Sequence, residues 1–209
     1  MVTNQVITPY ISLSNSKLGE FIPSINLPAG VTCREDAPCK KGCYAMKGRF
    51  AFPSVKTSMA RNLMIYQLMP DIYFGYIKMY LHAAAYKYFR LHSSGDIVDM
   101  AYLEGMVDVA KECKRTKFLC FTKKYELVND YIKANGKLPA NLIIVFSNWK
   151  DFKCENPYNL PTSYVRFKDC ECDIPETATQ CTGFCGECVN TKASCWKMKA
   201  GQSVVFNKH

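Results

Sequence analysis

The feature that most limits how this chain can fold is a cysteine-rich segment near its C-terminus. Six of the twelve cysteines lie between Cys170 and Cys195, in a stretch with almost no apolar run that could form a core. Inside it, Cys181, Cys185 and Cys188 have a Cys-x-x-x-Cys-x-x-Cys spacing, and the intervening glycines allow the backbone to curl so that three sulfurs face one centre. Disulfides between thiols this close would strain a small ring, so the spacing favours a metal or an iron–sulfur cluster.

Length and composition indicate one ordinary globular domain over residues 1–209, with an apolar fraction of 48%. The first residues contain no basic stretch followed by an apolar block, so we expect no signal peptide and a reducing, cytoplasmic location. In that compartment, many cysteines are typical of metal ligands, and an even-numbered disulfide framework is the alternative. No apolar stretch has the length of a membrane span, so we expect no membrane partner.

The formal net charge of +9 is compatible with an anionic partner. Short basic clusters occur at Lys40-Lys41, at residues 114–117 and at Lys123-Lys124. They allow either nucleic acid or an anionic small-molecule substrate as the partner, and the alternative is an ordinary solvated surface. Nothing in the sequence indicates an oligomeric state.

Alternating strand and helix patterns predict an α/β fold. The predicted strands are residues 21–28, 88–92, 118–121, 142–146, 164–167 and 204–206, and the predicted helices are 54–86 divided at Pro70, 101–113 and 125–134. The uncharged run at 142–146 is typical of a parallel sheet covered on both faces. We therefore expect a small or incomplete TIM-like barrel of about six parallel strands with a cysteine-rich metal-binding segment at residues 170–195, and a doubly wound open sheet is the alternative.

Polar residues follow the predicted strands at the end where barrels place their active sites. We expect catalytic roles for His92, Ser94, Asp96 and Lys123, and cofactor contacts from Ser94, Gly95, Asp96, Asn148 and His209. Thr122, Ser147 and Asn207 share that rim, as do the cysteines that follow the first strand, Cys33, Cys39 and Cys43. Each residue alone also has a structural interpretation, such as Asp96 capping the following helix or His92 binding a loop carbonyl.

The combination of several short motifs resembles one known family. The motifs are Leu27-Pro28, Cys33, Cys39, Cys43-Tyr44-Ala45, Arg90-Leu-His92, Ser94-Gly95-Asp96, Thr122-Lys123 and the closing Val205-Phe-Asn-Lys-His209. Together they resemble the phage gene-product-eighty-eight family over residues 17–209. The resemblance implies a bacteriophage or prophage-like gene, and hence the cytoplasm of a host cell.

A second resemblance is to radical S-adenosylmethionine enzymes, which have an incomplete barrel, a three-cysteine cluster after the first strand and a Gly-Gly-Glu segment after the second. Here Ser94-Gly95-Asp96 takes the place of that segment, and S-adenosylmethionine is the cofactor that this resemblance implies. Two features depart from the pattern. The family's cysteine spacing occurs in the tail instead of the first loop, and the acidic residue is Asp.

Twelve cysteines against three histidines favour iron–sulfur chemistry, so the first hypothesis is a protein with one or two [4Fe-4S] clusters. The expected ligands are Cys33, Cys39, Cys43, Cys181, Cys185, Cys188 and Cys195, with Cys172 a further candidate, whereas Cys113 and Cys120 should be apolar core residues. An iron without a protein thiolate would act as a Lewis acid in a lyase or transferase, with His92 or Asp96 exchanging protons with a small-molecule substrate. The alternatives are a radical S-adenosylmethionine enzyme and a non-enzymatic, zinc- or cluster-stabilised protein that binds nucleic acid or another partner.

Overall fold

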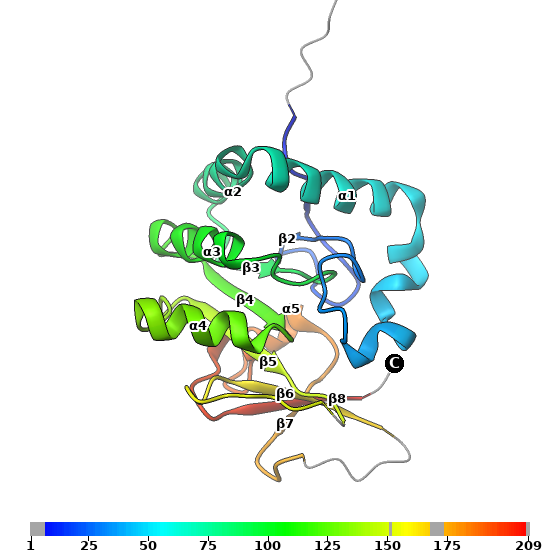
Figure 1. The fold of residues 1–209 in the computed structure, drawn as a ribbon, viewed down its shortest axis with the longest axis vertical. Helices are drawn as coiled ribbons and strands as arrows, with labels where there is room; N and C mark the ends of the chain where they lie inside the picture. The colour runs from blue at the N-terminus through cyan, green and yellow to red at the C-terminus, as the bar shows by residue number, and fades with distance from the viewer. Residues whose placement is uncertain (1–6, 151, 168–173, 208–209) are drawn as a thin grey trace, which may run out of the picture.

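One eight-stranded sheet organises the molecule (Figure 1). The computed structural model describes residues 7–150, 152–167 and 174–207. The strands are β1 (Ile11–Ser12), β2 (Ser24–Ile25), β3 (Tyr88–Leu91), β4 (Lys117–Thr122), β5 (Leu142–Ser147), β6 (Thr162–Arg166), β7 (Thr179–Gln180) and β8 (Ser203–Asn207). Their order in the sheet is β1-β2-β3-β4-β5-β6-β8-β7, and only the β1–β2 pair is antiparallel.

This strand order decides between the two predicted architectures. From β2 to β6 the strands lie side by side in chain order. In a doubly wound sheet the order of the strands reverses at a switch point, so that consecutive strands there are not neighbours. The doubly wound alternative is therefore wrong, and the mixed α/β class with a mainly parallel sheet is confirmed. Among the described residues no ladder joins β1 to β7, so the sheet is open and not a closed barrel.

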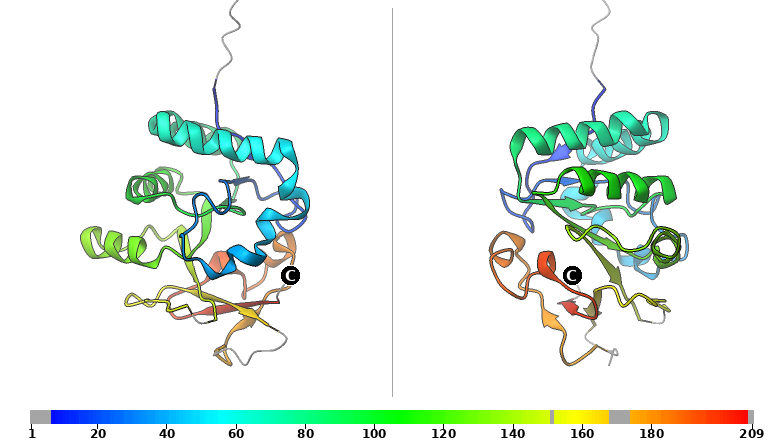
Figure 2. Two further views of the ribbon diagram at one scale, coloured as in Figure 1. Left: turned by 45° about the vertical axis from the view of Figure 1, so that its right-hand side comes forward. Right: turned by 90° about the vertical axis from the view of Figure 1, so that its left-hand side faces the viewer.

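Four long helices belong to the side of the sheet that holds the main apolar core (Figure 2). They are α1 (Pro53–Leu68), α2 (Pro70–Ala84), α3 (Met100–Glu112) and α4 (Tyr125–Asn135). Pro70 occupies the first position of α2, where its missing N–H costs nothing, so the predicted division at this residue is confirmed. The cap of α3 is Asp99, whose carboxylate accepts a 2.8 Å hydrogen bond from the Tyr102 backbone N–H, and not Asp96.

The opposite side of the sheet is covered by the N-terminal segment and the cysteine-rich tail. The tail contains a short helix α5 (Cys185–Cys188) and a 3₁₀ turn η4 (Cys195–Lys197). Strand alternation separates the two sides, because Phe118 and Cys120 of β4 belong to the helix-side core while Leu119 between them belongs to the smaller tail-side core. That smaller core consists of Leu18, Ile22, Leu119, Val145, Val189 and Trp196.

Two general expectations are answered by the described residues. All ten of the cysteines among them are free, so no disulfide framework links them. No helix in this part of the chain is long and apolar enough to cross a bilayer.

Candidate functional site

A cavity of about 1510 Å³ opens at the carboxyl ends of the parallel strands, on the tail side of the sheet. This exceeds the roughly 300–1,000 Å³ of ordinary ligand pockets. Seven cysteines line it, and they form two sets that we call the first-loop thiols (Cys33, Cys39, Cys43) and the tail thiols (Cys181, Cys185, Cys188, Cys195). They are the same seven cysteines that the sequence predicts as ligands. The two sets come from segments that are almost 140 residues apart along the chain.

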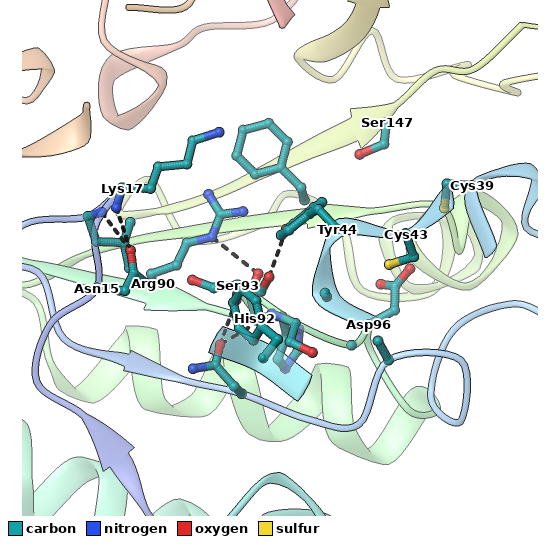
Figure 3. Close-up of a pocket in the computed structure, with 18 of the residues that line it drawn as sticks. Asn15, Lys17, Cys39, Cys43, Tyr44, Arg90, His92, Ser93, Asp96 and Ser147 are labelled. Atoms are coloured by element: carbon teal, nitrogen blue, oxygen red, sulfur yellow. Dashed lines mark hydrogen bonds between the residues drawn. The ribbon is translucent and has the colours of Figure 1, made fainter. Parts of the chain in front are cut away.

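The first-loop thiols lie in the segment between β2 and α1, which contains three 3₁₀ turns, η1 (Pro38–Gly42), η2 (Tyr44–Met46) and η3 (Gly48–Ala51). Cys33 precedes η1, Cys39 lies in it, and Cys43 lies between η1 and η2. The loop is tied to the end of β3 because the Tyr44 hydroxyl donates a 2.7 Å hydrogen bond to the Ser93 carbonyl. Arg34 anchors its outer side through ion pairs to Asp36 and Glu126. These contacts place Cys39 and Cys43 on the same side of the cavity as Asp96 (Figure 3).

The tail thiols are held against the sheet by backbone hydrogen bonds. The Cys185 N–H donates to the Lys17 carbonyl at 2.7 Å, and the Cys181 N–H donates to the Val205 carbonyl of β8 at 2.9 Å. The Gly183 N–H points at the Cys181 sulfur, at 3.4 Å. Trp196 is buried in the tail-side core next to Cys195, and its indole N–H has no hydrogen-bond acceptor among the described residues.

Burial sets the protonation of the thiols. It raises the pKa of Cys33, partly opposed by a hydrogen bond from the Gly30 backbone and reinforced by the charges of Asp96, Cys39 and Cys43. Burial likewise raises the pKa of Cys195 to about 12, with Cys181 adding to the effect and Arg90 opposing it. Without a bound cation these two thiols favour the protonated state, so metal binding at either set would release protons.

The turn at Ser94-Gly95-Asp96 packs tightly against the loop that follows β2. Gly95 has φ +81°, and a Cβ there would lie 2.7 Å from the Leu27 carbonyl oxygen and from Thr32 Oγ1, so only glycine fits. The Ser94 hydroxyl donates to the Leu27 carbonyl at 3.0 Å. The serine and glycine therefore join two strand ends, although both also line the cavity.

Asp96 is buried, with 5% of its surface exposed, and connects three neighbouring segments. Its Oδ1 accepts from the Ile97 N–H at 2.8 Å and its Oδ2 from the Lys123 N–H at 3.1 Å. Burial raises the pKa of this carboxyl, and hydrogen bonds from Thr122, Lys123 and Ile97 oppose that rise. Each carboxylate oxygen has a second lone pair, so Asp96 can still accept a further bond from the cavity side.

His92 lies at the end of β3, but its ring belongs to the helix-side core. Nε2 is 2.9 Å from the Tyr102 hydroxyl and Nδ1 is 3.7 Å from the Cys120 sulfur. Burial, helped by the charges of Arg90 and Lys124, lowers its pKa to about 3, so the imidazole is neutral at physiological pH. This location favours a structural role over proton exchange with the cavity.

The remaining candidates are distributed around the rim. Lys123 and Asn148 line the cavity, with the ammonium of Lys123 over the Trp149 ring at 5.3 Å. His209 and Cys172 lie outside the described residues. Arg90 and Lys17 also line the cavity. Arg90 belongs to one of the family motifs, but the sequence assigned neither residue a role in the site, because a cation in a strand or loop ordinarily belongs to the solvated surface.

The sulfurs do not yet meet around one point. Within the described residues, no three His, Cys, Asp or Glu side chains are close enough together to hold a metal ion. Binding a metal centre therefore requires the cysteine loops to contract. Gly183, between Cys181 and Cys185, allows such a movement because nothing lies within 4 Å of the position its Cβ would take.

Comparison with known proteins gives one match. A family model described as Gene product 88 matches residues 8–163, about three quarters of the chain, including the first-loop thiols and β1 to the start of β6. The matched region ends before the tail thiols, and it lends no support to the radical S-adenosylmethionine resemblance. No curated protein and no solved structure matches. The match supports the bacteriophage context, and the chain belongs to the Gene product 88 family.

Proposed function

We propose that this protein is a phage-type iron–sulfur protein that binds [4Fe-4S] clusters through both thiol sets and acts as a metalloenzyme on a small molecule. The observation that carries the proposal is the convergence of seven cysteines from two distant segments on one cavity. Fe–S clusters favour shells made entirely of thiolates, and the described wall holds seven cysteines but one histidine, His92, whose ring nitrogens lie beside the Tyr102 hydroxyl and the Cys120 sulfur. The donor set is therefore the one that such clusters require.

Two further contacts fit a sulfur-rich centre at the tail. The buried Trp196 indole N–H lacks an acceptor among the described residues, and a cluster sulfur next to Cys195 would supply one. The Gly183 N–H already donates to the Cys181 sulfur, the kind of hydrogen bond that tunes iron–sulfur centres. Both contacts would stabilise the negative charge that thiolates bring to the site.

The two sets differ in a way that divides their roles. Four tail thiols can complete the protein ligands of a four-iron cluster, whereas three first-loop thiols leave one position for a substrate. A cluster with such an open position supplies a Lewis acid. Among the residues near the first-loop thiols, Asp96 carries the proton-exchange role in this proposal, because its raised pKa brings it nearer to neutral pH.

The test is metal analysis of protein made and purified without oxygen, in wild type and in two variants. We expect iron and acid-labile sulfide in the wild type. Substituting Cys33, Cys39 and Cys43 together by Ala should remove the iron of one set and preserve the other, and the matched substitution of Cys181, Cys185 and Cys188 should do the reverse. Cys113→Ala is the control, since this buried thiol lies in the helix-side core and should not alter iron content.

Zinc without iron in the anaerobic preparation would overturn the proposal. It would favour a structural role instead, since four tail thiols also satisfy tetrahedral zinc. Iron that survives in full after both triple substitutions would equally contradict it.

A further inference from the structure

The charge lining the cavity is strongly unbalanced. Of the described residues in its wall, six are cationic, namely Lys17, Lys41, Arg49, Arg61, Arg90 and Lys123, and Asp96 is the only carboxylate. The Asp96 oxygens are hydrogen-bonded to backbone N–H groups and to Thr122, and none of the ion pairs among the described residues includes Lys17, Arg90 or Lys123. Thiolates aside, the cavity thus has positive charge that the carboxylates of the described residues leave largely uncompensated.

Arg90 is the best placed of these cations. Its guanidinium carbon lies 4.3 Å from the centroid of the Phe121 ring, and its Nε–H donates to the His92 carbonyl at 3.3 Å. Stacking on the Phe121 ring and this single hydrogen bond fix the plane of the Arg90 guanidinium group. The Nη1 and Nη2 groups have no hydrogen-bond acceptor among the described residues, and their four N–H groups suit bidentate contact with a carboxylate or phosphate.

Lys17 extends the same wall. Phe121 meets Phe206 edge-on with ring centroids 5.6 Å apart, and the Lys17 ammonium lies over Phe206 at 4.7 Å. Rings and cations therefore alternate in one line, and Figure 3 shows Lys17 and Arg90 on the side of the cavity away from Cys39 and Cys43. An anion held by both cations would lie across the cavity from the first-loop thiols.

We infer that Arg90 and Lys17 form an oxyanion-binding site, and that the cavity takes a small molecule bearing a carboxylate or phosphate group. The inference deepens the proposed function and rests on it for the reaction, since it names the substrate class of the same cavity. The anion contacts themselves require only the residues described above.

The competing explanation is that Arg90 serves only the tail thiolates, because its charge lowers the pKa of Cys185 and Cys195 against the effect of burial. However, no hydrogen bond from Arg90 to a sulfur occurs among the described residues, and its contacts are to a carbonyl and an aromatic ring. Lys123, over Trp149 on another part of the wall, is likewise not engaged with a thiol. Thiolate compensation therefore does not account for the whole charge pattern.

The experiment is calorimetric titration with two probes, inorganic pyrophosphate and citrate, at low ionic strength, using both iron-loaded and metal-stripped protein. We expect saturable binding of at least one probe, and which one binds better separates phosphate from carboxylate ligands. Arg90→Gln should weaken it by about tenfold or more, because bidentate charge-assisted hydrogen bonds are the strong ones. Lys17→Gln should weaken it less, and Arg90→Lys should give an intermediate loss even if Arg90→Gln folds poorly.

Lys78→Gln is the matched control for net charge, because Lys78 lies on α2 outside the cavity and pairs with Asp108 and Glu112. Equal weakening in this control, or no saturable binding of either probe by wild type, would overturn the inference. An Arg90→Gln variant that loses iron but binds the probes normally would also overturn the inference, since the charge of Arg90 would then act on the thiolates of the tail and not on an anion. Probe binding to protein that never contains iron would support the anion site and refute the proposed function.

Discussion

The two sides of the sheet are stabilised in different ways. The helix side buries a continuous core of 27 residues, including the rings of Tyr73, Tyr102 and Phe118, whereas the tail side buries only six apolar residues in its core. The described part of the tail contains four cysteines, and two of them, Cys185 and Cys195, pack against its small core. A helix-covered sheet is stabilised by apolar burial, and under the proposed function a tail with so little core would gain much of its order from a bound cluster.

Metal removal should separate the two sides most clearly. If the tail thiols hold a cluster, stripping the iron with a chelator should speed amide hydrogen exchange in residues 185–198 by a factor of roughly 100 or more, since a ligand at 100 times its Kd contributes about 2.7 kcal/mol. Exchange in α3 should change little, because it packs against the helix-side core on the other side of the sheet. Hydrogen exchange with mass spectrometry measures both, and equal acceleration on the two sides would contradict this division.

A core substitution tests the comparison from the helix side. Phe118 is fully buried there, and Phe118→Ala should lower the free energy of unfolding by about 3–5 kcal/mol. Iron content should be unchanged, because the cavity lies on the opposite face. Val145, equally buried in β5 but on the tail side, is the matched control. Denaturant unfolding should show that Val145→Ala costs less in metal-free protein than in loaded protein, whereas the cost of Phe118→Ala is the same in both.

Asp96→Asn tests the hydrogen bonds that connect the ends of β3 and β4. The carboxylate accepts hydrogen bonds at both oxygens, from Ile97 and Lys123, so an amide NH₂ would face a backbone N–H donor. A buried donor without an acceptor costs about 1–3 kcal/mol, and we expect that loss in unfolding experiments together with impaired turnover. Ser147→Ala, at the end of β5, is the control. Full stability of Asp96→Asn would show that the hydrogen bonds to Asp96 contribute nothing.

Residue patterns predicted the helix side well, because the boundaries of its helices and strands depend on residues close together in the chain. Pro70 ends one helix and starts the next, and the β-branched run in β5 is typical of a buried parallel strand. The short strands β1 and β7, with two residues each, had no periodicity to detect and were missed. The open sheet depends on contacts between distant segments, so the sequence alone could not decide whether the barrel would close.

The sequence predicted which residues line the cavity better than it predicted the directions of their side chains. Strand-end position correctly gathered Asp96, Lys123 and Asn148 on one cavity, because parallel strands place their carboxyl ends at the same edge. Side-chain direction was harder to predict, since His92 has φ +62° at the strand end and its ring lies in the core. The stacking of Arg90 on Phe121 could not be predicted, because Phe121 belongs to the neighbouring strand.

His92 gives the smallest predicted effect, and it again separates the two sides. Its pKa is lowered from 6.5 to about 3 by burial, so below pH 6.5 the unfolded chain takes up a proton that the folded protein does not. Stability should therefore be lost as pH falls from 6.5 toward 3, by up to about 1.4 kcal/mol for each pH unit. His92→Asn removes this titration while tolerating the left-handed backbone, so in urea unfolding its stability should depend less steeply on pH. If wild type and His92→Asn show the same slope over this range, the His92 ring is not buried as the helix-side core requires, and proton exchange with the cavity becomes its better explanation.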